Sequence, residues 1–382
     1  GIEAAVQVMR SGRLHRYNTL PGEKGETDLL EIEFADYLDV PYCLACSSGG
    51  YALHVAMQAA GIQRGDRVLC NAFTLAPVPG AIHNSGAEPV LVDVAEDFCI
   101  ELDDLEEKAA SSGARFFMLS HMRGHIADMD RIMAICRRHD LFLIEDCAHT
   151  MGASWNGVKS GTFGDIACFS TQTYKHINSG EGGFLTTHHA DVMARAIMHS
   201  GSYMLFDHHH AAPPVETFDQ IRYETPNYSG RMDNLRAAIL RPQLAQLDLQ
   251  CQRWNERYRI LEAALGTCAI IHVPARPEAE EFVASSIQFS LPGQNAEQMQ
   301  QVVKRCAVQG VALKWFGGAE PEGYTSRYDS WRYIADMPQL PRTEAILSTL
   351  LDMRIPLTFT TEDCQLIGEV IVEVIESLQQ NR

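Results

Sequence analysis

The sequence is poor in basic residues for its length and contains no long apolar run. Its 31 Lys and Arg stand against 49 Asp and Glu in 382 residues, which gives a formal net charge of −18. Nucleic acids and anionic membrane surfaces select clustered Lys and Arg, so we expect neither as a partner. No apolar stretch approaches the roughly 20 residues that span a bilayer, and no signal-peptide pattern is visible. We therefore expect a cytoplasmic protein that binds small molecules or another protein.

The eleven cysteines show no disulfide framework. Most lie in apolar runs, as small buried side chains do in a reducing compartment. Cys43 and Cys46 form one C-x-x-C pair, but no second pair accompanies it, so we interpret it as part of a strand. The histidines at 208–210 lie in a polar loop, and His121 and His125 in a glycine-broken turn, rather than on a helix face. We expect no metal site.

One lysine lies between two strand-like runs in the segment 168–184. Hydroxyl and amide side chains precede Lys175, and the chain returns to a strand through Gly-Glu-Gly-Gly at 180–183, a bend that glycine makes at low cost. A solvated loop lysine is the ordinary alternative. However, the apolar run 141–149 reaches a carboxylate pair that includes Asp146. Because ligands of open α/β sheets lie beyond the carboxyl ends of the strands, we expect Asp146 and Lys175 to share one site.

A glycine pair at Ser48-Gly49-Gly50 follows a strand pattern and precedes a helix pattern. The first turn of a helix has free backbone N–H groups and the positive end of the helix dipole, which favour phosphate binding. A plain strand-to-helix turn would give the same pattern. The turn is therefore a candidate phosphate site.

Strand and helix patterns alternate through the first half of the chain, which predicts a mostly parallel sheet with helices on both faces. We expect an α/β large domain at 1–245 with an irregular arm at 1–26, and a smaller α+β domain at 246–382. Thr27 is the expected cap of the first helix. Strands are predicted at 40–47, 65–70, 89–94, 116–122, 141–146, 184–187, 285–291 and 311–316, and helices at 28–38, 51–60, 76–84, 129–138, 192–197, 234–265, 297–308 and 361–379.

Six short motifs occur in one register from about residue 17 to about residue 260. They are Ser48-Gly-Gly-Tyr-Ala-Leu53, Gly65-Asp-Arg-Val68, Glu145-Asp-Cys-Ala-His149, Ser170-x4-Lys175, Gly180-Glu-Gly-Gly183 and Arg231-Met232. In this order they resemble the DegT/DnrJ/EryC1/StrS family of sugar aminotransferases that depend on pyridoxal 5'-phosphate. The resemblance implies an aspartate aminotransferase-like fold (fold type I), this cofactor, and a homodimer with shared active sites, for which the long segment 201–228 is a candidate interface.

The resemblance assigns the chemistry to three side chains. Lys175 would bind the cofactor covalently through its amine and carry protons once an amino donor displaces it. Asp146 would keep the ring nitrogen protonated, and each unit by which it raises that pKa corresponds to about 1.4 kcal/mol. His149 would lie beside the cofactor's 3-oxygen, where many relatives have glutamine.

The resemblance also places residues around the phosphate and the ring. Within one subunit these are Gly49, Gly50, Tyr51, Leu75, Ser170 and Gln172. Gly50 stands where a threonine is usual, and Leu75 where an aromatic ring usually stacks on the cofactor. A second subunit usually contributes an asparagine two residues before the arginine that Arg231 matches. Ser229 occupies that position and Asn227 lies two residues earlier, and the sequence leaves both open.

The leading hypothesis is transfer of an amino group from an amino acid, with L-glutamate the expected donor, to a carbonyl of a sugar or sugar acid. Another pyridoxal reaction on the same fold, such as a lyase or dehydratase, and a catalytically silent sensing protein are the alternatives. In the sugar dehydratases that resemble this family histidine replaces the lysine, so Lys175 argues against that branch. A nicotinamide enzyme is disfavoured because Ser48-Gly-Gly-Tyr lacks the G-x-G-x-x-G pattern.

Arg123 lies at a strand end on the expected ligand side of the sheet, where the family usually has an aromatic or aliphatic residue. A guanidinium there would suit a carboxylate on the acceptor or on glutamate, so Arg123 and Arg231 are the predicted substrate-binding residues. An acidic sugar such as an octulosonate is then a candidate acceptor. An internal salt bridge from Arg123 to Glu145 or Asp128 is the alternative.

Overall fold

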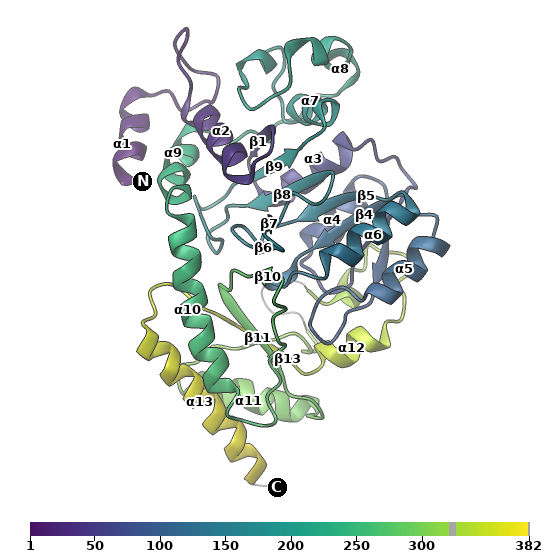
Figure 1. The fold of residues 1–382 in the computed structure, drawn as a ribbon, viewed down its shortest axis with the longest axis vertical. Coiled ribbons are helices and arrows are strands. Elements are labelled where there is room, and N and C mark those ends of the chain that lie inside the picture. The colour runs from purple at the N-terminus through teal and green to yellow at the C-terminus, as the bar shows by residue number, and fades with distance from the viewer. Residues whose placement is uncertain (321–325, 381–382) are drawn as a thin grey trace.

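The computed structural model describes residues 1–320 and 326–380, and a seven-stranded sheet forms its centre (Figure 1). The strand order is β1-β9-β8-β5-β4-β2-β3. Strands β2, β3, β4, β5 and β8 pair in parallel, whereas β9 runs antiparallel to β1 and β8. The strands are β1 (Tyr42–Cys46), β2 (Arg67–Asn71), β3 (Glu88–Val92), β4 (Phe116–Ser120), β5 (Phe142–Asp146), β8 (Ile166–Ser170) and β9 (Gly183–Thr187).

Helices cover both faces of this sheet, as its continuous apolar strands require. One face packs against α3, α4 and α7, and the other against α2, α5, α6 and α9. Successive strand residues enter opposite clusters, so Cys43 and Cys46 of the C-x-x-C pair lie on opposite faces of β1. The helices up to residue 244 are α1 (Ile2–Ser11), α2 (Glu26–Leu38), α3 (Gly49–Ala59), α4 (Pro77–Asn84), α5 (Leu102–Ser111), α6 (Met129–His139), α7 (Ala190–His199), α8 (Phe218–Glu224) and α9 (Asn234–Leu244).

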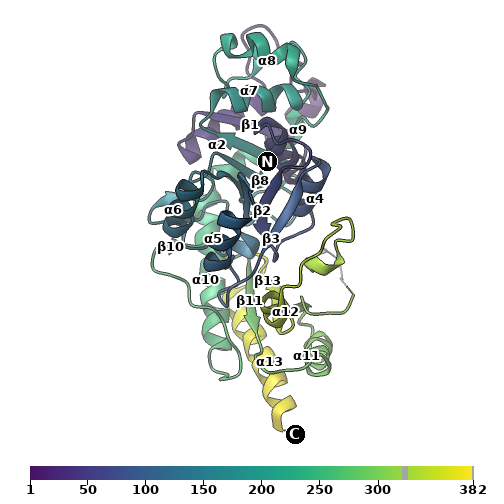
Figure 2. The ribbon, with the colours of Figure 1, turned by 90° about the vertical axis from the view of Figure 1, so that its right-hand side faces the viewer.

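A second, antiparallel sheet of order β11-β13-β12 forms the core of the C-terminal part with three helices (Figures 1 and 2). A further small sheet of order β10-β6-β7 joins residues of both parts. These elements are β6 (Ser154–Trp155), β7 (Val158–Lys159), α10 (Leu247–Leu265), β10 (Glu280–Glu281), β11 (Ser286–Ser290), α11 (Ala296–Val308), β12 (Lys314–Trp315), α12 (Pro341–Leu347), β13 (Leu350–Arg354) and α13 (Thr361–Gln380). No helix among the described residues is both long and apolar enough to cross a membrane.

Three local predictions are wrong, and one strand was missed. The expected irregular arm contains α1, whose C-terminus is closed by Gly12 in the left-handed conformation. Gly25, not Thr27, caps α2, because the Thr27 hydroxyl and N–H both donate to Asn234 Oδ1. The single helix expected at 234–265 is two helices, separated by Ala245 and Gln246. The central strand of the small sheet, β13, was not predicted.

The register of the large sheet places several polar side chains at one edge. Ser120, the last residue of β4, lies opposite Asp146, the last residue of β5, and β8 ends at Ser170 beside them. The N-terminus of α3 packs against the same edge, since a Cβ on Gly49 would lie 2.7 Å from Ser170 Cβ. The fold therefore gathers three strand ends and one helix N-terminus around a single point.

Candidate functional site

A cavity of about 320 Å³ lies at this edge, within the size range of small-molecule pockets. Both parts of the chain line it, since one arginine of β13 joins residues of the large sheet. Its lining includes Ser48, Gly49, Gly50, Leu75, Pro77, Ser120, Met122, Asp146, His149, Ser170, Gln172, Lys175, Glu181 and Arg354. The two residues that the sequence predicted to share a site, Asp146 and Lys175, thus lie in one cavity.

The loop between β8 and β9 presents Lys175 to the cavity. Thr171 and Thr173 donate backbone N–H groups to the carbonyls of Gly182 and Gly180, so the loop closes like a hairpin around the lysine. Lys175 Nζ lies 2.9 Å from His149 Nε2. Burial is the main cause that lowers the pKa of Lys175 to about 7. The charge of Asp146 opposes this shift, and the charges of Arg123 and Arg354 add to it. A large share of this amine is therefore neutral, and thus nucleophilic, near neutral pH.

His149 is a neutral partner for this amine. Burial, and after it the charge of Lys175, lowers the pKa of His149 well below its usual range. A neutral imidazole can accept a hydrogen bond at Nε2 and donate at Nδ1. His149 can therefore orient the Lys175 amine without adding charge to the cavity.

A chain of hydrogen bonds fixes the Asp146 carboxylate. Ser120 Oγ donates to Asp146 Oδ2 at 2.9 Å, and Thr74 Oγ1 donates to Ser120 Oγ at 2.8 Å. The Asn71 side-chain amide fixes the Ser120 backbone, because it accepts from the Ser120 N–H and donates to the Ser120 carbonyl. The backbone N–H of Ala148 donates to the other carboxylate oxygen at 3.2 Å. Asp146 is thus held rigidly at the cavity wall by the ends of two strands.

The N-terminus of α3 forms another wall. Ser48 caps the helix by accepting from the Tyr51 N–H at 3.0 Å, and helix geometry leaves the N–H groups of Gly49 and Gly50 without an intrahelical partner. A Cβ on Gly50 would lie 3.7 Å from Pro77, which is ordinary contact. A side chain at position 50 would therefore have room.

Four predicted residues lie away from the cavity of their own chain. The Tyr51 hydroxyl donates to the His199 carbonyl at 3.0 Å, so its ring points away from the site. Arg231 donates to the Gly201 carbonyl at 2.5 Å. Asn227 accepts from the Tyr203 N–H at 2.8 Å, and Ser229 is exposed. A role for Asn227, Ser229 or Arg231 at a neighbouring subunit's site stays a prediction.

Arg123 forms an internal salt bridge, which was the alternative interpretation from the sequence. Its guanidinium is buried and forms an ion pair with Asp352 Oδ2 at 3.0 Å. The partner is neither Glu145 nor Asp128 but a residue of β13. Arg123 also has a φ of 59°, a left-handed conformation that is rare outside glycine. We therefore correct its assignment from substrate binding to a contact between the two parts of the chain.

Two residues that line the cavity were not predicted from the sequence. Ser120 is a single serine at the end of an apolar strand, and no local pattern marks it. Arg354 ends β13, a strand that was not predicted, so nothing placed it near Lys175. Both positions depend on contacts between distant parts of the chain.

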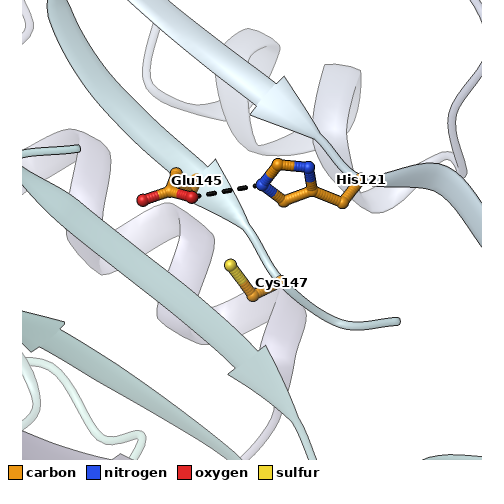
Figure 3. A group of neighbouring side chains, drawn as sticks. All are labelled: His121, Glu145 and Cys147. Atoms are coloured by element: carbon orange, nitrogen blue, oxygen red, sulfur yellow. Dashed lines mark hydrogen bonds and ion pairs between the residues drawn. The ribbon is translucent and has the colours of Figure 1, made fainter. Parts of the chain in front are cut away.

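A cluster of His121, Glu145 and Cys147 lies beside the site, and its ligand atoms fall within 4.8 Å of one another (Figure 3). Glu145 already accepts four hydrogen bonds, three from backbone N–H groups of the 161–164 loop and one from His121 Nε2. A carboxylate offers about four acceptor positions, so none is left for a metal ion. Burial raises the pKa of the Cys147 thiol well above its usual range. We interpret the cluster as a clamp on the loop that leads into β8.

The comparisons with known proteins agree with this geometry. A family model, described as the DegT/DnrJ/EryC1/StrS aminotransferase family, matches residues 2–372. The chain belongs to this family. It is 36% identical over 219 residues to GDP-perosamine synthase from Caulobacter vibrioides, a match covering 57% of this chain and 56% of that protein. It is 32% identical over 285 residues to L-glutamine:2-deoxy-scyllo-inosose aminotransferase from Streptomyces fradiae, covering 73% of this chain and 65% of that protein. The matched stretches thus span a little over half to two thirds of these family members.

Solved structures confirm the predicted fold type. 3-Amino-5-hydroxybenzoic acid synthase has a TM-score of 0.84 at 23% identity, with 98% of this chain and 96% of that chain covered. A Streptococcus pneumoniae protein solved in its PLP form has a TM-score of 0.83 at 20% identity, with 99% and 96% covered. By its description, the family to which the chain belongs is one of aminotransferases.

The residues of the cavity fit pyridoxal phosphate. The first turn of α3 and the Ser170 hydroxyl would hold the phosphate, and Asp146 would hold the protonated ring nitrogen. Lys175 supplies an amine that is neutral enough to bond to the cofactor's aldehyde. Leu75 would cover the ring from the cavity wall, and His149 would lie beside the 3-oxygen.

The two glycines of α3 give a matched test of the phosphate site. Gly49→Ala should weaken cofactor binding about tenfold or more, because its Cβ would push the helix from Ser170; tenfold corresponds to about 1.4 kcal/mol. Gly50→Ala should bind the cofactor nearly as the unmodified protein does, since its Cβ has room. Equilibrium titration of the cofactor-free proteins measures both. Equal effects of the two substitutions would place the phosphate elsewhere.

The lowered pKa of Lys175 gives a test by pH. Only the neutral amine attacks an aldehyde, so the rate at which cofactor-free protein captures pyridoxal phosphate should rise through about pH 7 and then level off. An ordinary lysine would show a rise that continues to about pH 10. Stopped-flow absorbance gives the rate, and pyridoxal, which lacks the phosphate, controls for phosphate titration. A rate still rising at pH 9 with both aldehydes would contradict the lowered pKa.

Proposed function

We propose that the protein transfers an amino group from L-glutamate to a carbonyl carbon of a sugar or sugar acid. The observation that carries this proposal is one cavity lined by a lysine of lowered pKa, a fixed carboxylate and a helix N-terminus. A lyase or dehydratase would need the same cofactor, and Lys175 argues against the dehydratase branch, in which histidine replaces the lysine.

Each residue has a defined task in this proposal. The cofactor, when bound, supplies an aldehyde for the amino group and a ring that accepts electrons. Lys175 holds the cofactor and then moves a proton at its Nζ, the atom that contacts His149. Asp146, whose carboxylate accepts hydrogen bonds from Ser120 Oγ and the Ala148 N–H, would hold a proton on the ring nitrogen. His149 orients Nζ.

The names of the relatives support a sugar-type acceptor. Perosamine synthase and the inosose aminotransferase are named for sugars or sugar-like rings, and the latter for L-glutamine as donor. We retain L-glutamate as the proposed donor. An octulosonate acceptor loses the support of Arg123, whose charge is matched by Asp352.

We further propose a homodimer with shared sites. The segment 201–228 exposes Tyr203, Met204, Tyr223 and Tyr228, which are 58%, 58%, 74% and 70% accessible in the single chain. Exposed apolar side chains gathered in one segment favour burial against a second surface. Such a dimer would bring Asn227, Ser229 or Arg231 to the neighbouring cavity.

Single-turnover kinetics test the proposed reaction. L-Glutamate added to the holoenzyme should give one equivalent of 2-oxoglutarate per site, with the nitrogen retained on the enzyme. Asp146→Asn should slow this step by about 100-fold or more, in the range of lost acid–base catalysis. Asp103→Asn, a change at an exposed residue of α5, is the matched control. Release of ammonia in place of retained nitrogen would point to a lyase, and an unaffected Asp146→Asn would remove its assigned role.

A further inference from the structure

The turn that follows β4 joins the cavity to the small domain. At its start Ser120 Oγ donates to the Asp146 carboxylate at 2.9 Å, and the next backbone N–H donates to the Asp146 carbonyl at 3.2 Å. Met122, two residues after Ser120, lines the cavity. Arg123 and His125 extend from the same turn to the small sheet. A shift of this turn would therefore move side chains at the cavity and at the small sheet together.

The backbone of this turn is in an unfavourable conformation. Arg123 has a φ of 59° and Gly124 a φ of 83°. Glycine adopts such angles at low cost, but a residue with a Cβ keeps them only where surrounding contacts impose them. The backbone also packs closely at Gly124, because a Cβ there would lie 3.0 Å from the Val283 carbonyl oxygen and 3.1 Å from that of His149. Contacts from outside the turn must therefore hold Arg123 in place.

A ring of four buried side chains supplies these contacts. The Arg123 guanidinium pairs with Asp352 Oδ2 at 3.0 Å, and His125 Nε2 lies 2.8 Å from Gln288 Oε1. Burial is the main cause that lowers the pKa of His125 well below its usual range, so the neutral ring donates to this amide oxygen. The Gln288 amide then donates to Asp352 Oδ1 at 2.6 Å, from the position opposite it in the register of β11 and β13. The small sheet thus holds the turn at two of its residues.

Aromatic contacts link the small domain to Ser120 by a second route. The Arg123 Cζ lies 5.8 Å from the centroid of the Phe316 ring, and Phe316 meets Phe73 edge to face at 5.0 Å between centroids. Phe73 immediately precedes the threonine whose hydroxyl donates to Ser120. Phe73, Phe316 and Met122 belong to one buried apolar cluster. Both routes therefore lead from the small domain to residues at the cavity.

We propose that Arg123, held by Asp352, is a positioning residue for the reaction: it fixes the turn from which Ser120 presents its hydroxyl to Asp146 and Met122 its side chain to the cavity. The inference rests on the proposed function in one respect, the assignment of Asp146 to the cofactor's ring nitrogen. Arg123 then acts through Ser120 rather than by touching a reactant, which distinguishes this role from the substrate binding that the sequence suggested.

Binding of 4'-deoxypyridoxine 5'-phosphate to the cofactor-free protein tests the inference without a covalent step. This analogue has the ring nitrogen and the phosphate but lacks the aldehyde, so its affinity reports on the ring contacts without the bond to Lys175. Arg123→Met and Asp352→Asn should each weaken it about fivefold or more, and the double variant, which removes both charges, should weaken it no further, because both changes break one contact. In a Ser120→Ala background, Arg123→Met should have an effect of less than about twofold. Full effects of both changes when combined there would overturn the inference.

A second ion pair between the two parts of the chain provides the matched control. Arg342 Nη1 of α12 lies 3.6 Å from Glu101 Oε1, outside the cavity lining, and Arg342→Met should leave the affinity for the analogue unchanged. Thermal unfolding of each cofactor-free variant identifies a purely structural effect. A lowered melting temperature of Arg123→Met with unchanged affinity would assign Arg123 to stability alone and contradict the positioning role.

Single turnover of L-glutamate by the holoenzyme separates this inference from the proposed function. Arg123→Met should lower the rate at saturating L-glutamate about fivefold or more and leave the half-saturating concentration within about twofold, since Arg123 does not bind the donor. A raised half-saturating concentration with an unchanged maximal rate would return Arg123 to substrate binding. If the unmodified enzyme does not turn over L-glutamate but the affinities for the analogue follow the expected pattern, the proposed donor is wrong and the positioning role stands.

Discussion

Removal of one lysine amine from bulk water is the constraint on which the site depends. The loop between β8 and β9 encloses Lys175, and burial lowers its pKa to about 7. An ordinary lysine at neutral pH carries its proton nearly all the time, and the protonated amine cannot attack an aldehyde. The glycines at 180 and 182, both with positive φ, allow the loop to turn back closely enough for this burial. Asp146 opposes this shift.

Contacts on both faces of the sheet fix the polar side chains around Lys175. Adjacent residues of β5 point to opposite faces, so Asp146 faces the cavity while Glu145 faces the loop 161–164. Glu145 fixes the chain that leads into β8, and β8 leads to the lysine loop. The ion pair between Arg123 and Asp352 then joins the small domain to this edge. The cavity is thus bounded by both parts of the chain.

The sequence was sufficient to predict the cavity residues that lie in short local motifs. Lys175, Asp146, His149 and the glycines of α3 lie in short motifs, and each lines the cavity. It was insufficient where a residue's role depends on a distant partner. Arg123 was assigned to substrate because Asp352, 229 positions later, had no predicted place. Arg354 was missed for a different reason, because the alternation of Leu351, Met353 and Ile355 with polar residues, which is typical of a strand, was not recognised.

Tyr51 shows a different limit of prediction from the sequence. Its motif placed it at the cofactor, but the first turn of a helix directs successive side chains about 100° apart, and its ring turns toward His199. The predicted boundary at 245/246 falls in the short break before α10 and stays a prediction, because the packing of the two parts does not by itself define independent folding.

Borohydride reduction of the holoenzyme, followed by peptide mass spectrometry, tests the central claim most directly. The account predicts that the reduced cofactor remains on the peptide containing Lys175 and on no other lysine peptide, and that Lys175→Ala remains unlabelled. Cofactor found on a different lysine, or labelling that survives in Lys175→Ala, would contradict the account.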